Sequence, residues 1–155
     1  MGYDISQITD YLYISAWPER KYAGEIRSLN VRLILSTHWW LPGKVLRQPP
    51  FQLLWLPVID SPLTPIPLVL LYRGVRAALA VIQEGGSVLV HCRYGVHRSV
   101  AMGCCVLIGK GYSAAEAMQM VKNRRKAADP YRWYIRSRIE KFELDWLKTR
   151  PEPPS

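Results

Sequence analysis

The sequence has few cysteines, no long hydrophobic run and few acidic residues. Its 155 residues contain three cysteines, Cys92, Cys104 and Cys105, and an odd number argues against a framework of disulfide bonds. No uninterrupted apolar stretch reaches the roughly 18 residues that a membrane-spanning helix requires. We therefore predict that the chain has no membrane span and that its thiols stay reduced.

Two further absences concern targeting and partners. Residues 1–12 lack the basic region followed by an apolar region that marks a secretory signal. We therefore expect a cytoplasmic protein. The chain also has no internal repeat, no zinc-type spacing of Cys and His and no nucleic-acid-binding motif. We expect neither a metal nor another cofactor, and we do not expect nucleic acid as a partner.

The shortage of acidic residues leaves a net charge of +9, from 21 basic and 12 acidic side chains. Such a charge suits an anionic partner, for example a phosphorylated protein. Part of the excess lies in residues 122–126 and in Arg132, Arg136 and Arg138. We interpret these residues as a solvent-exposed face, and the alternative is a patch that docks an anionic partner.

Apolar runs alternate with amphipathic stretches along residues 1–150, which we interpret as one domain followed by a frayed tail at residues 151–155. This alternation predicts an α/β fold: a single central, mostly parallel sheet of about four to five strands, with helices on both faces. We expect strands at residues 11–14, 31–35, 52–57 and 87–90. We expect helices at residues 18–29, 66–84 and 100–110, a helix after a capping box at residues 113–116, and a last helix after residue 130.

The most informative stretch is residues 88–99, VLVHCRYGVHRS. A β-branched apolar run is followed by a tight loop that contains Gly95, and an apolar helix follows Ser99. A loop between a strand and a helix directs several backbone N–H groups at one place, and the positive end of the helix dipole lies behind them. The stretch therefore predicts a binding site for an oxyanion.

Three side chains add chemistry to this anion site. Cys92 lies where the strand ends, and we expect its thiol to ionise well below its free pKa of about 8.5. Arg98 carries a planar fork that matches two oxygens of a phosphate group. The Ser99 hydroxyl can hydrogen-bond the sulfur and ease its later departure. A thiolate that faces a charge-neutralised phosphate is a nucleophile for phosphoryl transfer.

The pattern His91-Cys92, five residues, Arg98-Ser99 resembles the signature of the cysteine-dependent protein tyrosine phosphatases. The short chain looks most like the small atypical dual-specificity phosphatases, which are little more than a catalytic domain. The resemblance implies their fold, a phosphate bound by the loop, and a His91 that orients this loop. The loop residues predicted to bind the substrate are Arg93, Tyr94, Gly95, Val96, His97 and Arg98.

Asp60 is the candidate general acid. It follows the predicted strand 52–57 on a proline-rich loop, beyond the carboxyl end of that strand, where sites form in open α/β sheets. Its position also resembles that of the acidic residue in dual-specificity phosphatases. A positioned acid that protonates the leaving oxygen contributes about 10²–10⁴-fold to such a reaction. The alternative is an Asp that only caps the next helix.

We therefore predict a metal-independent phosphatase that hydrolyses phosphotyrosine, and also phosphoserine and phosphothreonine, through a phosphocysteine. Arg93 and His97 add positive charge to the loop, so a phosphoinositide or RNA-end phosphatase is the enzymatic alternative. The alternatives from other classes are a non-catalytic phosphate-binding module and a rhodanese-like sulfurtransferase. The complete set of Cys92, Arg98 and Asp60 argues against the binding module, and the Asp60 loop and the Arg98-Ser99 ending argue against the sulfurtransferase.

Other residues of reactive type have structural interpretations. Cys104 and Cys105 fall within an apolar helix and are expected to pack in the core. His38 is interpreted as structural. Trp39 and Trp40 follow the predicted strand 31–35, so they either line the mouth of the site or pack the next loop against the sheet.

Overall fold

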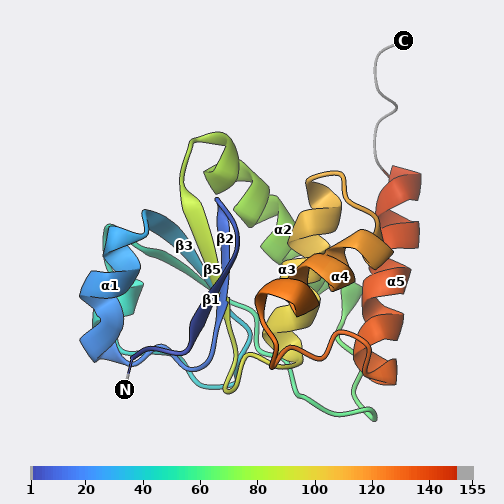
Figure 1. Cartoon of the computed structure of the whole chain (residues 1–155), viewed down its shortest axis with the longest axis horizontal. Helices are drawn as coiled ribbons and strands as arrows, with labels where there is room; N and C mark the ends of the chain where they lie inside the picture. The colour runs from blue at the N-terminus through green and yellow to red at the C-terminus, as the bar shows by residue number, and fades with distance from the viewer. Residues whose placement is uncertain (1, 150–155) are drawn as a thin grey trace.

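The computed structural model describes residues 2–149, which form a five-stranded sheet covered by helices on both faces (Figure 1). The predicted tail at residues 151–155 lies outside the described residues. The elements follow in this order: β1 (Ile5–Thr9), β2 (Leu12–Ser15), η1 (Arg20–Tyr22), α1 (Ala23–Ser28), β3 (Val31–Ser36), η2 (Lys44–Arg47), β4 (Gln52–Trp55), α2 (Leu68–Gln83), β5 (Ser87–His91), α3 (Arg98–Gly109), α4 (Ala114–Arg124) and α5 (Trp133–Thr149).

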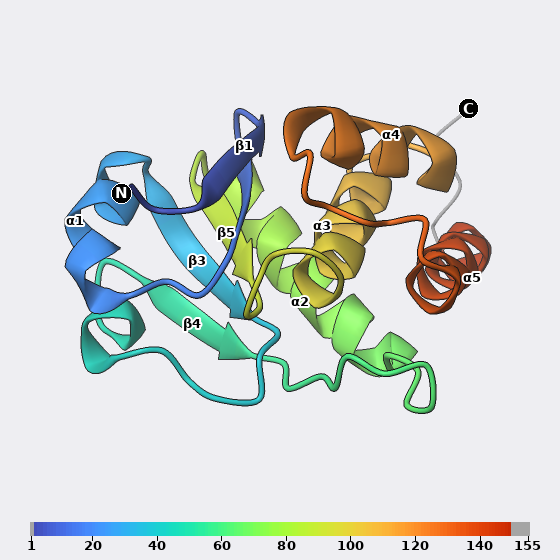
Figure 2. The same cartoon turned by 60° about the horizontal axis from the view of Figure 1, so that its bottom comes forward.

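The sheet has the strand order β1-β2-β5-β3-β4. Strand β5 lies at its centre and runs parallel to β2 on one side and to β3 on the other, and β3 runs parallel to β4. Only β1 is antiparallel, and it pairs with β2. The predicted fold class, a mostly parallel sheet within an α/β fold, is confirmed. The central strand therefore ends at the edge where the loops after β2, β3 and β4 also begin (Figure 2).

Each face of the sheet is covered by its own apolar core. The larger core buries one face under α2, α3, α4 and α5, with α3 lying next to the sheet. Nearly all of α3 is buried, including Cys104 and Cys105, so these two residues pack in the core as predicted. The smaller core places Ile26 of α1 and Leu46 of η2 against Ile34 and Leu89 on the opposite face.

Three elements differ from the sequence prediction. The single helix expected at 18–29 is instead a short 3-10 helix, η1, followed by α1, and the helical stretch begins only after Glu19, whose backbone is extended. Residues 41–50, for which no helix was expected, contain η2, which buries Leu46 completely. No strand was expected at residues 5–9, where the structure has β1. Its residues are mostly half-buried, so its periodicity is weak.

The last two helices follow their predicted patterns. Ser113 and Glu116 form a capping box at the start of α4, as the sequence predicts. The apolar stripe of α5 buries Ile135, Ile139 and Phe142. Phe142 also contacts the rings of Tyr72 and Trp146, at centroid distances of 5.0 and 5.7 Å.

We predict that Phe142→Ala lowers the free energy of unfolding by about 3–5 kcal/mol, because it leaves a cavity in the larger core. Leu144→Ala on the same helix is the matched control. Leu144 is exposed, so this variant should change the free energy by less than about 0.5 kcal/mol. Urea unfolding of both variants measures the difference, and similar midpoints for the two would contradict this packing.

Candidate active site

The loop between β5 and α3 (Figure 2) begins at Cys92 and provides polar contacts to its sulfur. Cys92 follows the last residue of β5 and is only 3% exposed. The backbone N–H of Gly95 donates a hydrogen bond to Cys92 Sγ over 3.2 Å. Ser99 Oγ lies 3.1 Å from the same sulfur, on the first turn of α3. The sulfur therefore has two polar partners before any substrate is present.

Gly95 is the position in this loop that requires glycine. Its φ is +68°, in the region that side chains with a Cβ rarely adopt. A Cβ placed there would also lie 2.8 Å from the carbonyl oxygen of Ser15 and 2.5 Å from the Arg125 guanidinium. Both constraints follow from how closely the loop packs against the end of β2.

Arg98 connects this loop to the loop between β4 and α2. It is the first residue of α3, and its Nη1 donates a hydrogen bond of 3.1 Å to the carbonyl oxygen of Val58. Its Nε is buried and has no acceptor among residues 2–149. A buried donor without a partner is costly, so the guanidinium is set to receive an acceptor from a ligand. One nitrogen of the guanidinium, Nη1, is thus held by Val58, and another, Nε, has no partner among the described residues.

His91 is completely buried under the loop. Burial lowers the pKa of His91 to about 4, so the ring is neutral at physiological pH. Its Nδ1 lies 3.3 Å from the carbonyl oxygen of Cys92, to which a neutral ring with a proton on Nδ1 can donate. Thr37 Oγ1 donates to the His91 carbonyl oxygen over 2.7 Å. The geometry agrees with the orienting role that the family resemblance implies.

Asp60 faces the nucleophile from the loop between β4 and α2. It lines a cavity of about 210 Å³ together with Cys92 and Arg98. Its two carboxylate oxygens accept hydrogen bonds from different elements: from Tyr134 of α5 over 2.6 Å and from Nδ1 of His97 over 2.9 Å. Asp60 caps no helix, because α2 begins at Leu68 after Pro67. The bond from His97 holds the Asp60 loop against the catalytic loop, and the bond from Tyr134 holds it against α5.

These partners also set the ionisation of Asp60. Partial burial raises its pKa, but the hydrogen bonds from Tyr134 and His97 and the charge of Arg98 lower it by more, so the net pKa is below the ordinary value. The carboxylate is therefore ionised at neutral pH when the site is empty. A bound phosphate dianion adds negative charge beside it, which favours the protonated form that a general acid needs.

The remaining loop residues line two different cavities. Val96, His97 and Tyr94 line the cavity that contains Cys92. Arg93 is exposed and points instead to a neighbouring cavity, with its guanidinium 5.4 Å from the centre of the Tyr94 ring. The structure therefore brings every predicted site residue except Arg93 to the cavity or to its immediate support.

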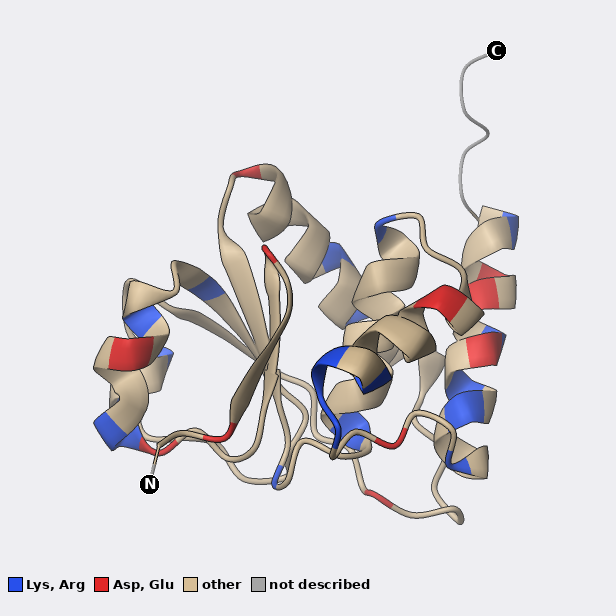
Figure 3. Ribbon diagram, viewed as in Figure 1, with Lys and Arg blue, Asp and Glu red and all other residues tan. Residues whose placement is uncertain are grey.

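Arg125 corrects the prediction that residues 122–126 form an exposed face. It follows α4, at the end of the basic segment drawn in blue in Figure 3, but its side chain is only 2% exposed. Nε donates to the carbonyl oxygen of Gly95 over 2.8 Å, and Nη2 donates to that of Tyr94 over 3.0 Å. The guanidinium also pairs with Asp4 over 3.0 Å. It is a positioning residue for the catalytic loop.

Sequence reasoning missed two supporting side chains, Arg125 and Tyr134. A signal for Arg125 was present, because it lies four residues after Val121 and so continues the buried face of α4. No comparable signal marks Tyr134. It precedes the buried Ile135 on α5 and meets Asp60 only because the helix packs beside that loop.

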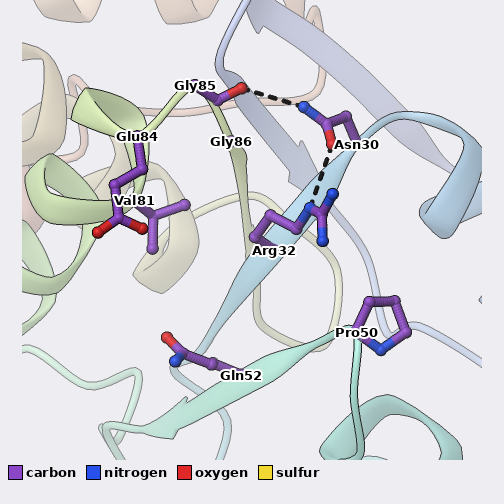
Figure 4. A pocket seen from close by; sticks show the side chains of 8 residues that line it. All are labelled: Asn30, Arg32, Pro50, Gln52, Val81, Glu84, Gly85 and Gly86. Carbon is purple, nitrogen blue, oxygen red and sulfur yellow. Dashed lines mark hydrogen bonds between the residues drawn. The ribbon is translucent and has the colours of Figure 1, made fainter.

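Residues 2–149 contain no group of three or more His, Cys, Asp or Glu side chains that could hold a metal ion. No helix within this range is long and apolar enough to cross a membrane. A cavity of about 330 Å³ lies at the amino ends of β3 and β4 (Figure 4). There Arg32 donates to Asn30, which donates to the carbonyl oxygen of Gly85, and no nucleophile is present.

The fold and the loop define a cysteine-dependent phosphomonoesterase. Residues 12–143 match the family model of the dual specificity phosphatase catalytic domain, and the chain belongs to this family. It is 31% identical over 149 residues to dual specificity protein phosphatase 1B of Arabidopsis thaliana, an alignment that covers 92% of this chain and 83% of that protein.

Two human comparisons agree with this assignment. The chain is 36% identical over 120 residues to human dual specificity phosphatase 28, covering 77% of this chain and 66% of that protein. The crystal structure of human DUSP28 superposes with a TM-score of 0.81 at 26% identity, covering 95% and 97% of the two chains. The fold and the resemblance expected from the sequence are confirmed, and the protein is a dual-specificity protein phosphatase.

We predict that Arg125→Met lowers kcat/KM for an aryl phosphate on the order of 10²-fold, because a loop displacement of about 1 Å has such an effect. It should also lower the melting temperature, since two loop carbonyls and Asp4 lose their donor. Arg124→Met is the matched control, because the neighbouring Arg124 is exposed. Equal activity of the two folded variants would show that Arg125 does not position the loop.

Proposed function

We propose that the enzyme hydrolyses phosphorylated tyrosine, serine and threonine side chains of proteins through a phosphocysteine intermediate. The observation that carries the proposal is the position of Cys92 Sγ, which lies inside the loop with the Gly95 N–H and Ser99 Oγ at 3.2 and 3.1 Å. Arg98 and Asp60 line the same cavity. These groups supply the nucleophile, the charge stabilisation and the acid that the reaction needs, and no metal is required.

In the first step the Cys92 thiolate attacks phosphorus in line with the leaving oxygen. The S–P bond forms, the bond between phosphorus and the ester oxygen breaks, and protonated Asp60 gives its proton to that oxygen. Arg98 and the backbone N–H groups of residues 93–98 bind the three equatorial oxygens of the phosphoryl group. Catalysis thus rests on positioning and on charge stabilisation.

In the second step water releases the phosphate. The Asp60 carboxylate left by the first step takes a proton from the water, and the water oxygen attacks phosphorus. The S–P bond breaks and the thiolate returns, with the Ser99 hydroxyl placed to stabilise its charge. Inorganic phosphate leaves, and Asp60 again carries the proton with which the cycle began.

The rim of the cavity supports a broad choice of phosphorylated residue. Tyr94 at the rim is exposed, and the cavity is small, about 210 Å³. A shallow site reaches the phosphate of a short serine or threonine side chain as well as that of tyrosine. We further propose that the enzyme acts in the cytoplasm on phosphorylated proteins, with the net charge of +9 favouring acidic partners.

The first test is release of phosphate from an aryl phosphate in the presence of EDTA. We expect the reduced enzyme to stay active with the chelator and Cys92→Ser to show no turnover above background, because a serine hydroxyl remains protonated at neutral pH. Cys104→Ser is the control, since Cys104 is buried in α3. Activity that disappears with EDTA, or that survives in Cys92→Ser, would refute the thiolate mechanism.

The pH dependence tests the role of Asp60. The hydrogen bond from Tyr134 lowers the pKa of Asp60, so Tyr134→Phe should raise this pKa and let the acid keep its proton to higher pH. We therefore predict that the high-pH limb of kcat/KM moves to higher pH in Tyr134→Phe. The measurement is a pH–rate profile, which reports groups of the free enzyme.

Asp60→Asn provides the control for this profile. It removes the acid, so the limb should vanish and kcat should fall by about 10²–10⁴-fold for an ester with a poor leaving group. An unshifted limb in Tyr134→Phe, or a limb that persists in Asp60→Asn, would assign the titration to another group.

A further inference from the structure

A second cavity adjoins the catalytic loop and is lined mainly by aromatic rings. Its volume is about 370 Å³, larger than that of the cavity around Cys92. Its walls come from the segments after β2, β3 and β5, which are neighbours in the sheet. The lining residues are Trp17, His38, Trp40, Arg93 and Tyr94.

Tyr94 joins the two cavities, because it lines both of them. The backbone fixes this arrangement: the N–H of Trp17 donates to the carbonyl oxygen of Arg93 over 2.9 Å. One wall of the aromatic cavity is therefore tied to the loop that binds phosphate. A peptide whose phosphate contacts Cys92 can therefore reach the aromatic cavity past the Tyr94 ring with a neighbouring residue, since consecutive Cα atoms are about 3.8 Å apart.

The walls of the aromatic cavity carry no charge apart from Arg93. Partial burial and the nearby charges of Arg98 and Arg93 lower the pKa of His38, so its ring is neutral at physiological pH. Its Nδ1 accepts a hydrogen bond from the backbone N–H of Trp40 over 2.9 Å, and its ring lies edge-on to Trp17 at 4.9 Å. These contacts fix the His38 ring at the wall of the cavity, whose mainly aromatic lining suits an apolar group.

Trp40 is the exposed part of this wall. Its side chain is 70% exposed, which is costly for so large an apolar group and typical of a recognition surface. The neighbouring Trp39 is also exposed, but it lines a different cavity with Pro57, Val58 and Ile59. Trp40 therefore lines the mouth of the site next to the catalytic loop, which is one of the two roles considered for this pair of tryptophans. Trp39 does not line that cavity.

Arg93 adds one cation at the edge of the aromatic cavity. Its Nε donates to the Tyr94 hydroxyl over 3.0 Å. Within the part of the chain that the structure describes, no carboxylate forms an ion pair with it. The guanidinium is therefore free to attract a substrate that carries negative charge near its phosphorylated residue.

We propose that the cavity formed by Trp17, His38, Trp40 and Tyr94 binds an aromatic side chain of the protein substrate, within two residues of the phosphorylated one. The inference rests on the proposed function, since it assumes a phosphorylated protein as substrate. Aromatic pairs gain stabilisation from stacked and edge-to-face contacts beyond the burial of area. An adjoining acidic residue of the same peptide then lies near Arg93.

The test compares phosphopeptides that differ at one position. Each carries phosphotyrosine between glycines, with Trp placed in turn at the first or second residue on either side. At one or more positions we expect Trp to raise kcat/KM about tenfold over the all-glycine peptide, in line with the discrimination that apolar pockets achieve. Trp40→Ala should abolish this preference and leave kcat/KM for the all-glycine peptide within about twofold, and Trp40→Phe should restore part of it.

Trp39→Ala is the matched control, because it removes the same kind of exposed ring from the other cavity and should keep the preference. Equal turnover of all peptides by the unmutated enzyme would overturn the proposed subsite and leave the phosphatase function intact. A preference that survives in Trp40→Ala would also overturn it. If the enzyme hydrolyses an aryl phosphate, phosphoinositides or 5′-phosphorylated RNA but none of these peptides, the protein substrate and the subsite both fail.

Discussion

The catalytic loop depends on hydrogen-bond donors, most of them outside the loop, that donate to its carbonyl oxygens. In a trans peptide the N–H and C=O point in opposite directions, so N–H groups can converge on an anion only if the oxygens find partners elsewhere. Each carbonyl of residues 92–97 has such a partner. The donors, in order, are the His91 ring, the Trp17 N–H, Arg125 for two successive oxygens, the Asp129 N–H and the Ala101 N–H.

This requirement explains why distant parts of the chain converge on one loop. The donors come from the end of β5, the segment after β2, the end of α4, the segment before α5 and the first turn of α3. The loop is therefore a rigid feature of the whole fold, and its preorganisation precedes the arrival of phosphate. Gly95 contributes in a different way. Its positive φ lets the chain turn where Arg125 and the end of β2 leave no space for a side chain.

The acid loop is held by a second network, which is coupled to the first. His97 belongs to the catalytic loop and bonds to Asp60, while its Nε2 lies 3.7 Å from Asp129, whose N–H supports the Val96 carbonyl. Arg132 pairs with the same Asp129 over 3.3 Å. His97 and Asp129 therefore connect the Asp60 loop, the catalytic loop and the segment before α5.

The sequence was sufficient for features that depend on local pattern. The strand before Cys92, the capping box at Ser113 and the buried stripe of α5 each follow from short-range periodicity or spacing. The spacing from Cys92 to Ser99 also placed the reactive groups on one loop. The spacing from Val121 marks Arg125 as buried, but no local pattern predicts what Arg125 or Tyr134 contacts. Their roles arise from tertiary packing, which brings α4 and α5 to the loops after β5 and β4.

Several basic side chains that contribute to the positive charge also have structural roles. Lys122 donates to the carbonyl oxygens of Lys126 and Ala128 over 2.7 and 3.0 Å, and so satisfies groups just beyond the end of α4. Arg138 donates to the carbonyl oxygen of Ile66 over 2.9 Å, and Arg125 supports the catalytic loop. These cations act first as donors to backbone oxygens around the site. Since a fixed guanidinium or ammonium group still contributes its field, the framework that shapes the loop also draws anionic substrates towards it.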